Sequence, residues 1–290
     1  MARKSSEPKK PLWQRILREI REWALFFLIL AIGIRLIAPT KLFHPNRDDA
    51  SHEALLARTD VEHLLIETDR GELSGYLLRG GEDPAPLVLY FGGNMENAAS
   101  TINRLNSRQR AAFEGWHFAQ IDYPGYGLSE GRPSDTDLKR IALTAYDALA
   151  AREDVTSIVV LGYSIGTGPA NYVATNRDVA GLMLMAPYAD GVDLFNSVVN
   201  IFHGPLKLLV SYNMSSVAFA KDIVVRPLIF ASEQDELVPY ASAVRLSAAY
   251  PDGCEFVTVS GIRHNGFWHS TAVLDGIAKY LDGIVNPSGT

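Results

Sequence analysis

The pentapeptide Gly162-Tyr163-Ser164-Ile165-Gly166 limits the possible folds of this chain more than any other feature of its sequence. It directly follows residues 157–161, a short, mostly aliphatic run that is typical of a buried β-strand, and it opens a segment predicted to be helical. A strand that turns at once into a helix has room only for very small side chains two residues before and two residues after its central residue. Glycine occupies both positions here. The sequence therefore predicts a tight strand–turn–helix unit that holds Ser164 up at the edge of a sheet.

Apolar segments that resemble strands alternate with amphipathic segments that resemble helices along most of the chain. The expected strands are residues 61–68, 72–78, 86–91, 116–123, 157–161, 180–185, 226–231 and 255–259. The first two flank Asp69-Arg70-Gly71, which is a hairpin signal, and the others are separated by predicted helices. We therefore expect an α/β fold over residues 60–285, with a mainly parallel central sheet, helices on both faces and an antiparallel edge.

Residues 190–222 interrupt this alternation. They lie between two expected strands, are rich in apolar residues and are too long for a bare loop. We interpret them as a small helical cap, which at the carboxyl edge of the sheet would cover a site. The alternative is an ordinary crossover helix with a long lead-in.

The predicted position of Ser164 is that of a nucleophile, which needs a base and an acid that orients the base. His264 follows the last expected strand, and Asp235 follows the strand before it. Because the carboxyl ends of parallel strands share one edge of the sheet, these loops converge there. We therefore predict a catalytic triad of Ser164, Asp235 and His264.

Other residues of the right type are weaker candidates. Asp190 follows the expected strand 180–185 and is the alternative acid, while Glu233 and Glu236 flank Asp235. His269 is close to His264 in sequence but is expected to start the last helix. Because no cysteine pair accompanies these two histidines, we expect no metal. We also expect no other cofactor.

The loop after the strand 86–91 contains Gly92-Gly93-Asn94-Met95. In a nucleophile-elbow arrangement, one oxyanion donor is the N–H group of the residue after the nucleophile, here Ile165, and the other comes from this loop. Asn94 is the predicted second donor, with Met95 as the alternative. The alternative interpretation is that this loop supplies no oxyanion donor and is a plain strand-to-helix turn in which an asparagine caps the helix.

These motifs together resemble the α/β-hydrolase superfamily, and specifically its small membrane-anchored, serine-aminopeptidase-like members. The shared motifs are Tyr90-Phe91-Gly92-Gly93-Asn94, Asp122-Tyr123-Pro124-Gly125-Tyr126-Gly127, Gly162-Tyr163-Ser164-Ile165-Gly166, Asp235-Glu236-Leu237-Val238-Pro239 and His264-Asn265. The resemblance implies the fold and the triad. It does not imply one substrate, because the superfamily includes esterases, lipases, thioesterases and peptidases. Where such proteins usually have His-Gly this chain has Gly92-Gly93, so a side chain that often steadies the oxyanion loop is missing.

The N-terminus has a different composition from the rest. Residues 1–22 are basic and amphipathic, and residues 23–34 contain no charge before Arg35 interrupts the apolar run. We interpret residues 23–38 as a membrane anchor, single-pass or half-inserted, followed by a linker over residues 39–59. A cleaved signal peptide and a soluble helix that covers a groove of its own domain are the alternatives. The sequence leaves open which side of the membrane the domain faces.

Charge and chemistry together narrow the expected function. The net charge of −6 argues against a nucleic-acid partner, and the single cysteine excludes an intrachain disulfide. We expect a serine hydrolase that cleaves an ester or thioester acyl bond, in a small-molecule or lipid-like substrate presented at the membrane. A serine peptidase of the same fold and a non-catalytic, membrane-tethered binding protein are the alternatives. The sequence indicates no particular protein partner.

Overall fold

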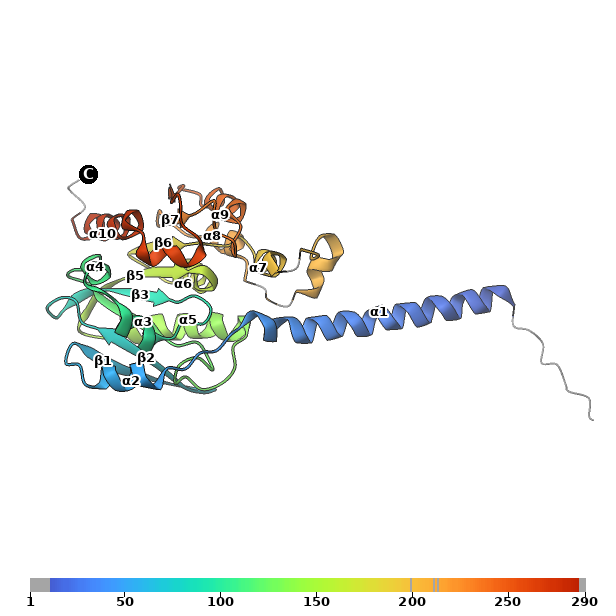
Figure 1. Cartoon of the computed structure of the whole chain (residues 1–290), viewed down its shortest axis with the longest axis horizontal. Helices are drawn as coiled ribbons and strands as arrows, with labels where there is room; N and C mark the ends of the chain where they lie inside the picture. Colours follow the sequence, from blue (N-terminus) through green and yellow to red (C-terminus); the bar gives the residue numbers. More distant parts are fainter. Residues whose placement is uncertain (1–10, 199, 211, 213, 287–290) are drawn as a thin grey trace, which may run out of the picture.

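The computed structural model describes residues 11–198, 200–210, 212 and 214–286, which contain an eight-stranded sheet with the order β1-β2-β4-β3-β5-β6-β7-β8 (Figure 1). The strands are β1 (Val61–Thr68), β2 (Gly71–Leu78), β3 (Ala85–Phe91), β4 (His117–Ile121), β5 (Val155–Tyr163), β6 (Gly181–Met185), β7 (Leu228–Ala231) and β8 (Glu255–Thr258). β2 pairs antiparallel with β1 and β4, and the remaining pairs are parallel. The predicted parallel sheet with an antiparallel hairpin at its edge is therefore confirmed.

Helices cover both faces of this sheet. The helices are α1 (Leu12–Leu42), α2 (Asp49–Leu56), α3 (Ala98–Arg104), α4 (Ser107–Ala111), α5 (Asp135–Ala150), α6 (Thr167–Asn176), α7 (Gly191–Val198), α8 (Ser216–Ala220), α9 (Tyr240–Ser247) and α10 (Thr271–Val285). Side chains of β3 alternate between two cores, with Leu89 packing on the side of α5 and α6 and Val88 on the side of α3 and α10. This alternation follows from the two-residue period of a strand that is buried on both faces.

The segment between β6 and β7 is helical, as the sequence predicts. It contains α7, the 3₁₀ helix η2 (Gly204–Leu209) and α8. Two further 3₁₀ helices, η1 (Ser164–Gly166) and η3 (His264–His269), follow β5 and β8. α7 and the segment after it lie on the same side of the molecule as α1 (Figure 1).

Helix α1 extends away from the sheet domain (Figure 1). Most of its apolar side chains are exposed. Among the described residues, no helix is both long and apolar enough to cross a membrane. The single-pass form of the predicted anchor is therefore not supported. Charged residues precede the uncharged run 23–34, and Arg35 ends it.

The predicted linker, residues 39–59, is structured over much of its length. Helix α1 continues through Pro39 to Leu42, and α2 follows from Asp49. Asp48 caps α2 by accepting the N–H group of Ser51 at 3.0 Å, and Leu55 of this helix is buried in the core. A buried leucine and a capped first turn stabilise a helix that sequence composition alone did not reveal.

Candidate active site

The predicted strand–turn–helix unit forms around Ser164. β5 ends at Tyr163, and Ser164 has a φ of 53°, a left-handed conformation that is rare for residues other than glycine. A Cβ atom on Gly166 would lie 2.0 Å from the carbonyl oxygen of Phe91, and one on Gly162 would lie 2.7 Å from that of Gly166. Both glycines are thus required by close backbone packing, for the reason that the sequence suggested.

Ser164, His264 and Asp235 are joined by hydrogen bonds. His264 Nε2 lies 2.9 Å from Ser164 Oγ, and His264 Nδ1 lies 2.8 and 2.9 Å from the two Asp235 oxygens. The side chains of His264 and Asp235 are only 5% and 2% exposed. An aspartate on Nδ1 favours the tautomer whose Nε2 is free to accept a proton. The arrangement can therefore activate the serine hydroxyl as a nucleophile.

The competing acids Asp190 and Glu236 make other hydrogen bonds and do not bond to the imidazole of His264. Asp190 accepts the hydroxyl of Ser215 at 2.5 Å and is not hydrogen-bonded to His264. Glu236 accepts the main-chain N–H group of His264 at 3.1 Å and pairs with Arg263. Asp235 is the carboxylate that contacts the imidazole. His269, the other nearby histidine, ends η3 rather than starting the last helix.

The candidate oxyanion loop, residues 92–96, follows β3. The N–H group of Gly93 donates to Glu96 Oε2 at 2.7 Å, and the N–H group of Glu96 donates to the carbonyl of Gly93 at 3.2 Å. These two donors are engaged, whereas no hydrogen bond within the loop occupies the N–H groups of Asn94 and Met95, the two predicted candidates. Asn97, rather than Asn94, caps α3 by accepting the N–H group of Ser100.

Comparison with known proteins adds to this geometry. No protein-family model matches the sequence. An uncharacterised protein of Mycobacterium tuberculosis strain H37Rv is 28% identical over 228 residues, which cover 75% of this chain and 78% of that protein. The α/β-hydrolase domain-containing protein 17C of Xenopus tropicalis is 28% identical over 266 residues, covering 84% of this chain and 82% of that protein.

Solved structures share the same architecture. Est1E of Butyrivibrio proteoclasticus with bound ferulic acid superposes with a TM-score of 0.63 at 19% identity, covering 77% of this chain and 99% of that one. The esterase Pf2001 of Pyrococcus furiosus superposes with a TM-score of 0.63 at 13% identity, covering 84% and 98%. The chain has the α/β-hydrolase fold. The resemblance drawn from the sequence motifs is confirmed at this level.

Glu96 supports the candidate oxyanion loop, in which Gly92-Gly93 stands where the sequence resemblance leads us to expect His-Gly. Its Oε2 accepts the hydroxyl of Tyr90 at 2.6 Å as well as the N–H group of Gly93, and Trp268 Nε1 donates to Tyr90 at 3.1 Å. Burial of the carboxyl raises the pKa of Glu96. Sequence reasoning missed this residue. An acid three residues beyond Gly93 is the signal that could have revealed it.

The loop 122–134 also contacts the candidate oxyanion loop. The hydroxyl of Tyr123 donates to the carbonyl of Gly92 at 2.9 Å, and that of Tyr126 donates to Asn94 Oδ1 at 2.8 Å. Asp122 Oδ1 accepts the N–H group of Ala98 at 2.7 Å, and burial raises the pKa of Asp122 to about 7. The loop thus holds the oxyanion loop in place.

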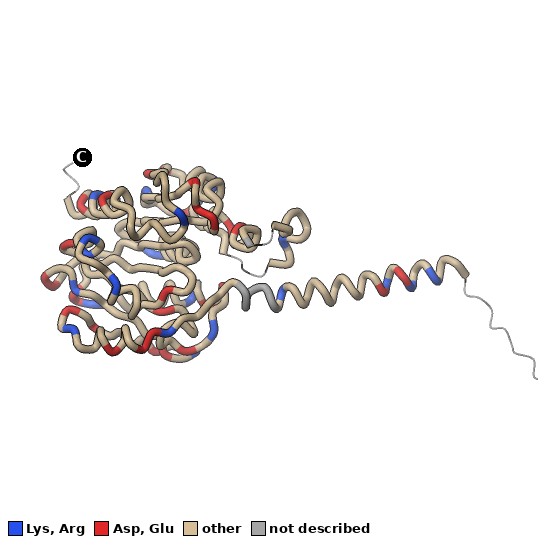
Figure 2. The backbone as a smooth tube through the Cα atoms, viewed as in Figure 1, with Lys and Arg blue, Asp and Glu red and all other residues tan. Residues whose placement is uncertain are grey.

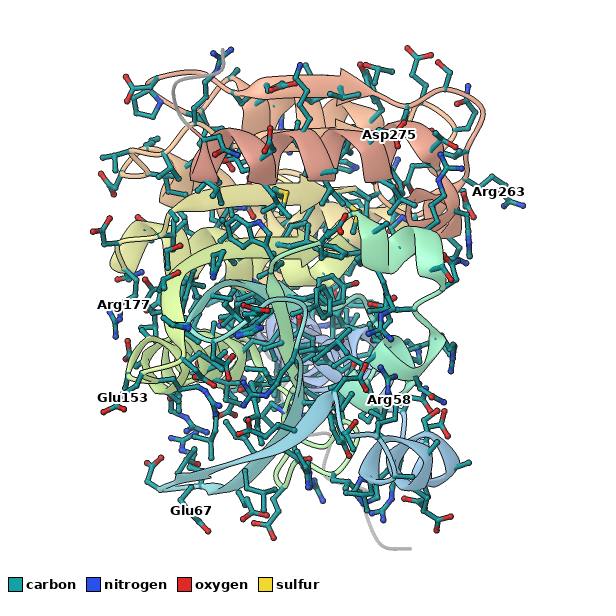
Figure 3. The ribbon with its side chains drawn as sticks, turned by 90° about the vertical axis from the view of Figure 1, so that its left-hand side faces the viewer. Arg58, Glu67, Glu153, Arg177, Arg263 and Asp275 are labelled. Atoms are coloured by element: carbon teal, nitrogen blue, oxygen red, sulfur yellow. The ribbon has the colours of Figure 1, made fainter. Side chains whose placement is uncertain are left out.

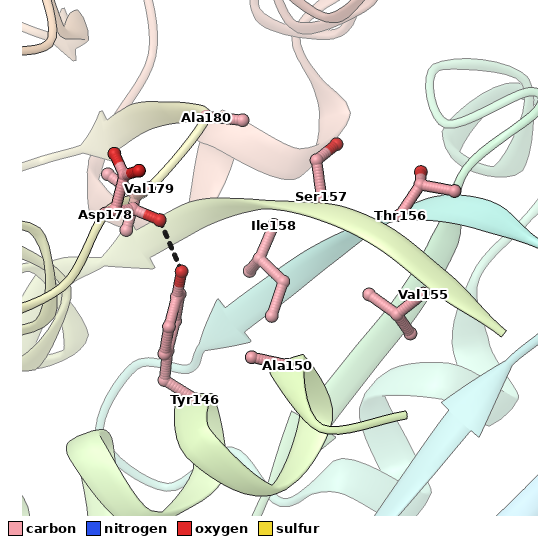
Figure 4. Close-up of a pocket in the computed structure, with 9 residues that line it drawn as sticks. All are labelled: Tyr146, Ala150, Val155, Thr156, Ser157, Ile158, Asp178, Val179 and Ala180. Carbon is pink, nitrogen blue, oxygen red and sulfur yellow. Dashed lines mark hydrogen bonds between the residues drawn. The ribbon is translucent and has the colours of Figure 1, made fainter. Parts of the chain in front are cut away.

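A surface pocket of about 290 Å³ lies away from these residues (Figure 4). It is lined by Tyr146, Ile158 and Val179 among others, and the hydroxyl of Tyr146 donates to the carbonyl of Asp178. The pocket lies at the beginning of β5, whereas Ser164 follows the end of this strand. It is therefore separate from the candidate active site. Among the described residues, no cluster of three or more histidine, cysteine or acidic side chains is arranged to hold a metal ion.

Proposed function

We propose that the protein is a serine hydrolase that cleaves an ester or thioester acyl bond through an acyl-enzyme on Ser164. The observation that carries this proposal is the 2.9 Å contact between Ser164 Oγ and His264 Nε2, combined with the 2.8 Å contact between His264 Nδ1 and Asp235. A nucleophile, a base and an orienting acid at hydrogen-bonding distance are the minimum that acyl transfer to serine requires.

The proposed reaction has two halves. His264 Nε2 takes the proton of Ser164 as its oxygen attacks the acyl carbonyl, and the N–H groups of Ile165 and Asn94, or of Met95 in its place, stabilise the oxyanion. The intermediate then expels the alkoxide or thiolate, which takes the proton from His264. Water deprotonated by His264 attacks the acyl-enzyme, and its collapse releases the acid and returns the proton to Ser164.

Exposed apolar side chains on α1 and on the cap support a lipophilic substrate presented at a membrane surface. Exposed apolar side chains on α1 include Trp23 and Phe27, at 61% and 59% exposure, and the uncharged part of this helix is evident in Figure 2. In η2 of the cap, Leu208 is 76% exposed, and its carbonyl accepts Arg35 Nη1 of α1 at 2.7 Å. We therefore propose that α1 is half-inserted, with the cap beside it.

The side of the molecule opposite to α1 carries exposed charged side chains. Viewed from that side, charged side chains such as Glu67, Glu153 and Arg263 point away from the ribbon (Figure 3). A surface of exposed charges favours water, while exposed aromatic and aliphatic side chains favour the interface of a bilayer. The proposed orientation places the end of the molecule that carries α1 toward lipid.

Hydrolysis of p-nitrophenyl esters, from acetyl to dodecanoyl, tests the proposal with the full-length protein. We expect turnover and labelling by a fluorophosphonate probe, and we expect Ser164→Ala to abolish both while the melting temperature stays close to that of the parent. A preference for longer acyl chains is expected from the apolar surroundings. Labelling that persists in Ser164→Ala would refute the assignment of the nucleophile.

A further inference from the structure

The segment at the C-terminal end of α1, the chain's longest described helix, contacts the oxyanion loop directly. We call residues 42–46 the brace segment. Asn94 Nδ2 donates to the carbonyl of Leu42 at 2.5 Å, and Asn94 Oδ1 accepts the main-chain N–H group of His44 at 2.9 Å. That N–H group also lies 3.0 Å from the hydroxyl of Tyr126, which itself donates to Asn94 Oδ1. The side-chain amide of Asn94 is therefore satisfied on both of its atoms.

The other end of the brace segment holds the next residue of the loop. Asn46 Nδ2 donates to the carbonyl of Met95 at 2.9 Å, and the carbonyl of Asn46 accepts the N–H group of Gly127 at 2.8 Å. Between these contacts, Phe43 is only 6% exposed, and its ring packs on that of Tyr212 with centroids 5.9 Å apart. Buried packing and hydrogen bonds fix the brace segment to the domain. A flexible linker would lack such contacts.

These contacts act on the residues whose N–H groups are the candidate second oxyanion donor. Met95 has a φ of 70°, in the left-handed region, a strained conformation that a non-glycine residue keeps only where surrounding contacts hold it. A donor must lie within about 0.5 Å of its productive position to stabilise an oxyanion. Hydrogen bonds to the Asn94 side chain and to the Met95 carbonyl restrain these two residues. They therefore help to fix the position of the candidate N–H donors.

We propose that the brace segment is a positioning element for oxyanion stabilisation, and that Asn46 and His44 act on the reaction through Asn94 and Met95. The inference deepens the proposed function and rests on it. Because Leu42 is also the last residue of α1, the helix proposed to contact lipid ends on the oxyanion loop. The N-terminal region is thus part of the catalytic architecture as well as a means of attachment.

Steady-state kinetics of Asn46→Ala in the full-length protein test this inference. The matched control is Asn176→Ala, because Asn176 Nδ2 also donates to a main-chain carbonyl, that of Tyr172 at 2.7 Å, far from the loop. With p-nitrophenyl butyrate, we expect Asn46→Ala to lower kcat roughly tenfold with KM nearly unchanged. The affinity for an alkyl trifluoromethyl ketone, which forms a tetrahedral adduct with serine, is expected to fall by a similar factor. Asn176→Ala is expected to match the parent in each measurement.

A milder variant covers the case in which Asn46→Ala does not fold. Tyr126→Phe removes only the hydroxyl that contacts Asn94 and His44, and we expect it to lower kcat and ketone affinity together, by a smaller factor. Unchanged kcat in the folded variants, or a change confined to KM, would refute the positioning role while leaving the proposed function intact. A parent protein without Ser164-dependent turnover would instead refute the proposed function, and this inference with it.

Discussion

The ring of Tyr163 stacks on the imidazole of His264, with centroids 5.3 Å apart and planes inclined by 24°. The hydroxyl of Tyr163 also donates to the main-chain carbonyl of His264 at 2.8 Å. Tyr163 directly precedes Ser164. The residue before the candidate nucleophile therefore contacts both the imidazole and the main chain of the candidate base. The stacking limits rotation of the imidazole about its side-chain bonds, and the hydrogen bond holds the main chain of His264 in place.

Removal of the ring should therefore affect turnover more than removal of the hydroxyl. We expect Tyr163→Phe to lower kcat by roughly fivefold or less, and Tyr163→Ala by roughly 100-fold, because a misplaced base loses most of its effect. Ester hydrolysis and thermal melting measure the two effects. Tyr280→Ala is the control, since Tyr280 hydrogen-bonds Leu182 and Arg226 away from the site and should change stability without a matching loss of kcat.

The acid can be tested by a pair of isosteric changes. We expect Asp235→Asn to lower kcat by about 10⁴-fold, the size of the loss when the aspartate of a Ser-His-Asp triad becomes asparagine, because His264 then loses the partner that fixes its tautomer. Asp190→Asn should change kcat little, since Asp190 contacts Ser215 instead. A larger loss in Asp190→Asn than in Asp235→Asn would contradict the geometry of the candidate triad.

The features that could be predicted from the sequence depend on residues that are close together in the chain, whereas the missed contacts join residues that are far apart. Gly162 and Gly166 are required by a turn only a few residues long, and Ser164, Asp235 and His264 each follow a recognisable strand. The roles of Tyr163 and His44 depend instead on which residues meet after the sheet assembles, because their partners, His264 and Asn94, are distant in sequence. Local pattern carries no information on such pairings.

Stability should depend on pH through Asp122. Burial raises the pKa of this carboxyl to about 7, from 3.8 in the absence of shifts, so the folded protein binds a proton between these values that the unfolded chain has released. The contribution of Asp122 to stability is therefore fully present below about pH 4 and is lost as the pH rises to about 7. Urea unfolding of the parent and of Asp122→Asn at several pH values isolates this contribution.

The difference between the two proteins gives the readout. We expect the free energy of unfolding of the parent, relative to Asp122→Asn, to decrease as the pH rises from 5 to 8, because the variant carries no titrating group at this position. Other titrating groups affect both proteins and cancel in the difference. A difference that is constant over this range, or that increases, would contradict the raised pKa.

The cap should contribute to membrane attachment beside α1. Leu208 is 76% exposed and its carbonyl is bonded to Arg35 of α1, so we expect Leu208→Glu to weaken binding of the full-length protein to phosphatidylcholine–phosphatidylglycerol vesicles several-fold. Val224→Glu is a matched control, because Val224 is 78% exposed but lies beyond the cap tip, after α8. Equal binding by both variants in a flotation assay would exclude the cap from the contact.

Deletion of residues 1–40 should separate attachment from catalysis. The deletion removes the exposed apolar part of α1 but keeps the brace segment, whose Asn46 and His44 contact the oxyanion loop. We therefore expect a protein that no longer binds vesicles yet hydrolyses short-chain esters. Deletion of residues 1–47 removes the brace segment as well and should lower kcat further, by roughly tenfold or more, because both restraints on the loop are lost.

A high-salt wash distinguishes electrostatic attachment to the membrane from attachment by burial of apolar side chains. At 1 M salt the Debye length is about 3 Å, which screens the basic residues near the N-terminus but does not weaken burial of apolar side chains such as Trp23 and Phe27. The full-length protein should therefore remain on vesicles at high salt, and release by salt alone would indicate purely electrostatic attachment.

Two other outcomes would support the alternatives to an anchor. If the protein that lacks residues 1–40 is insoluble or inactive, a helix that covers its own domain is favoured. A mature N-terminus near Gly33 would indicate cleavage of a signal peptide.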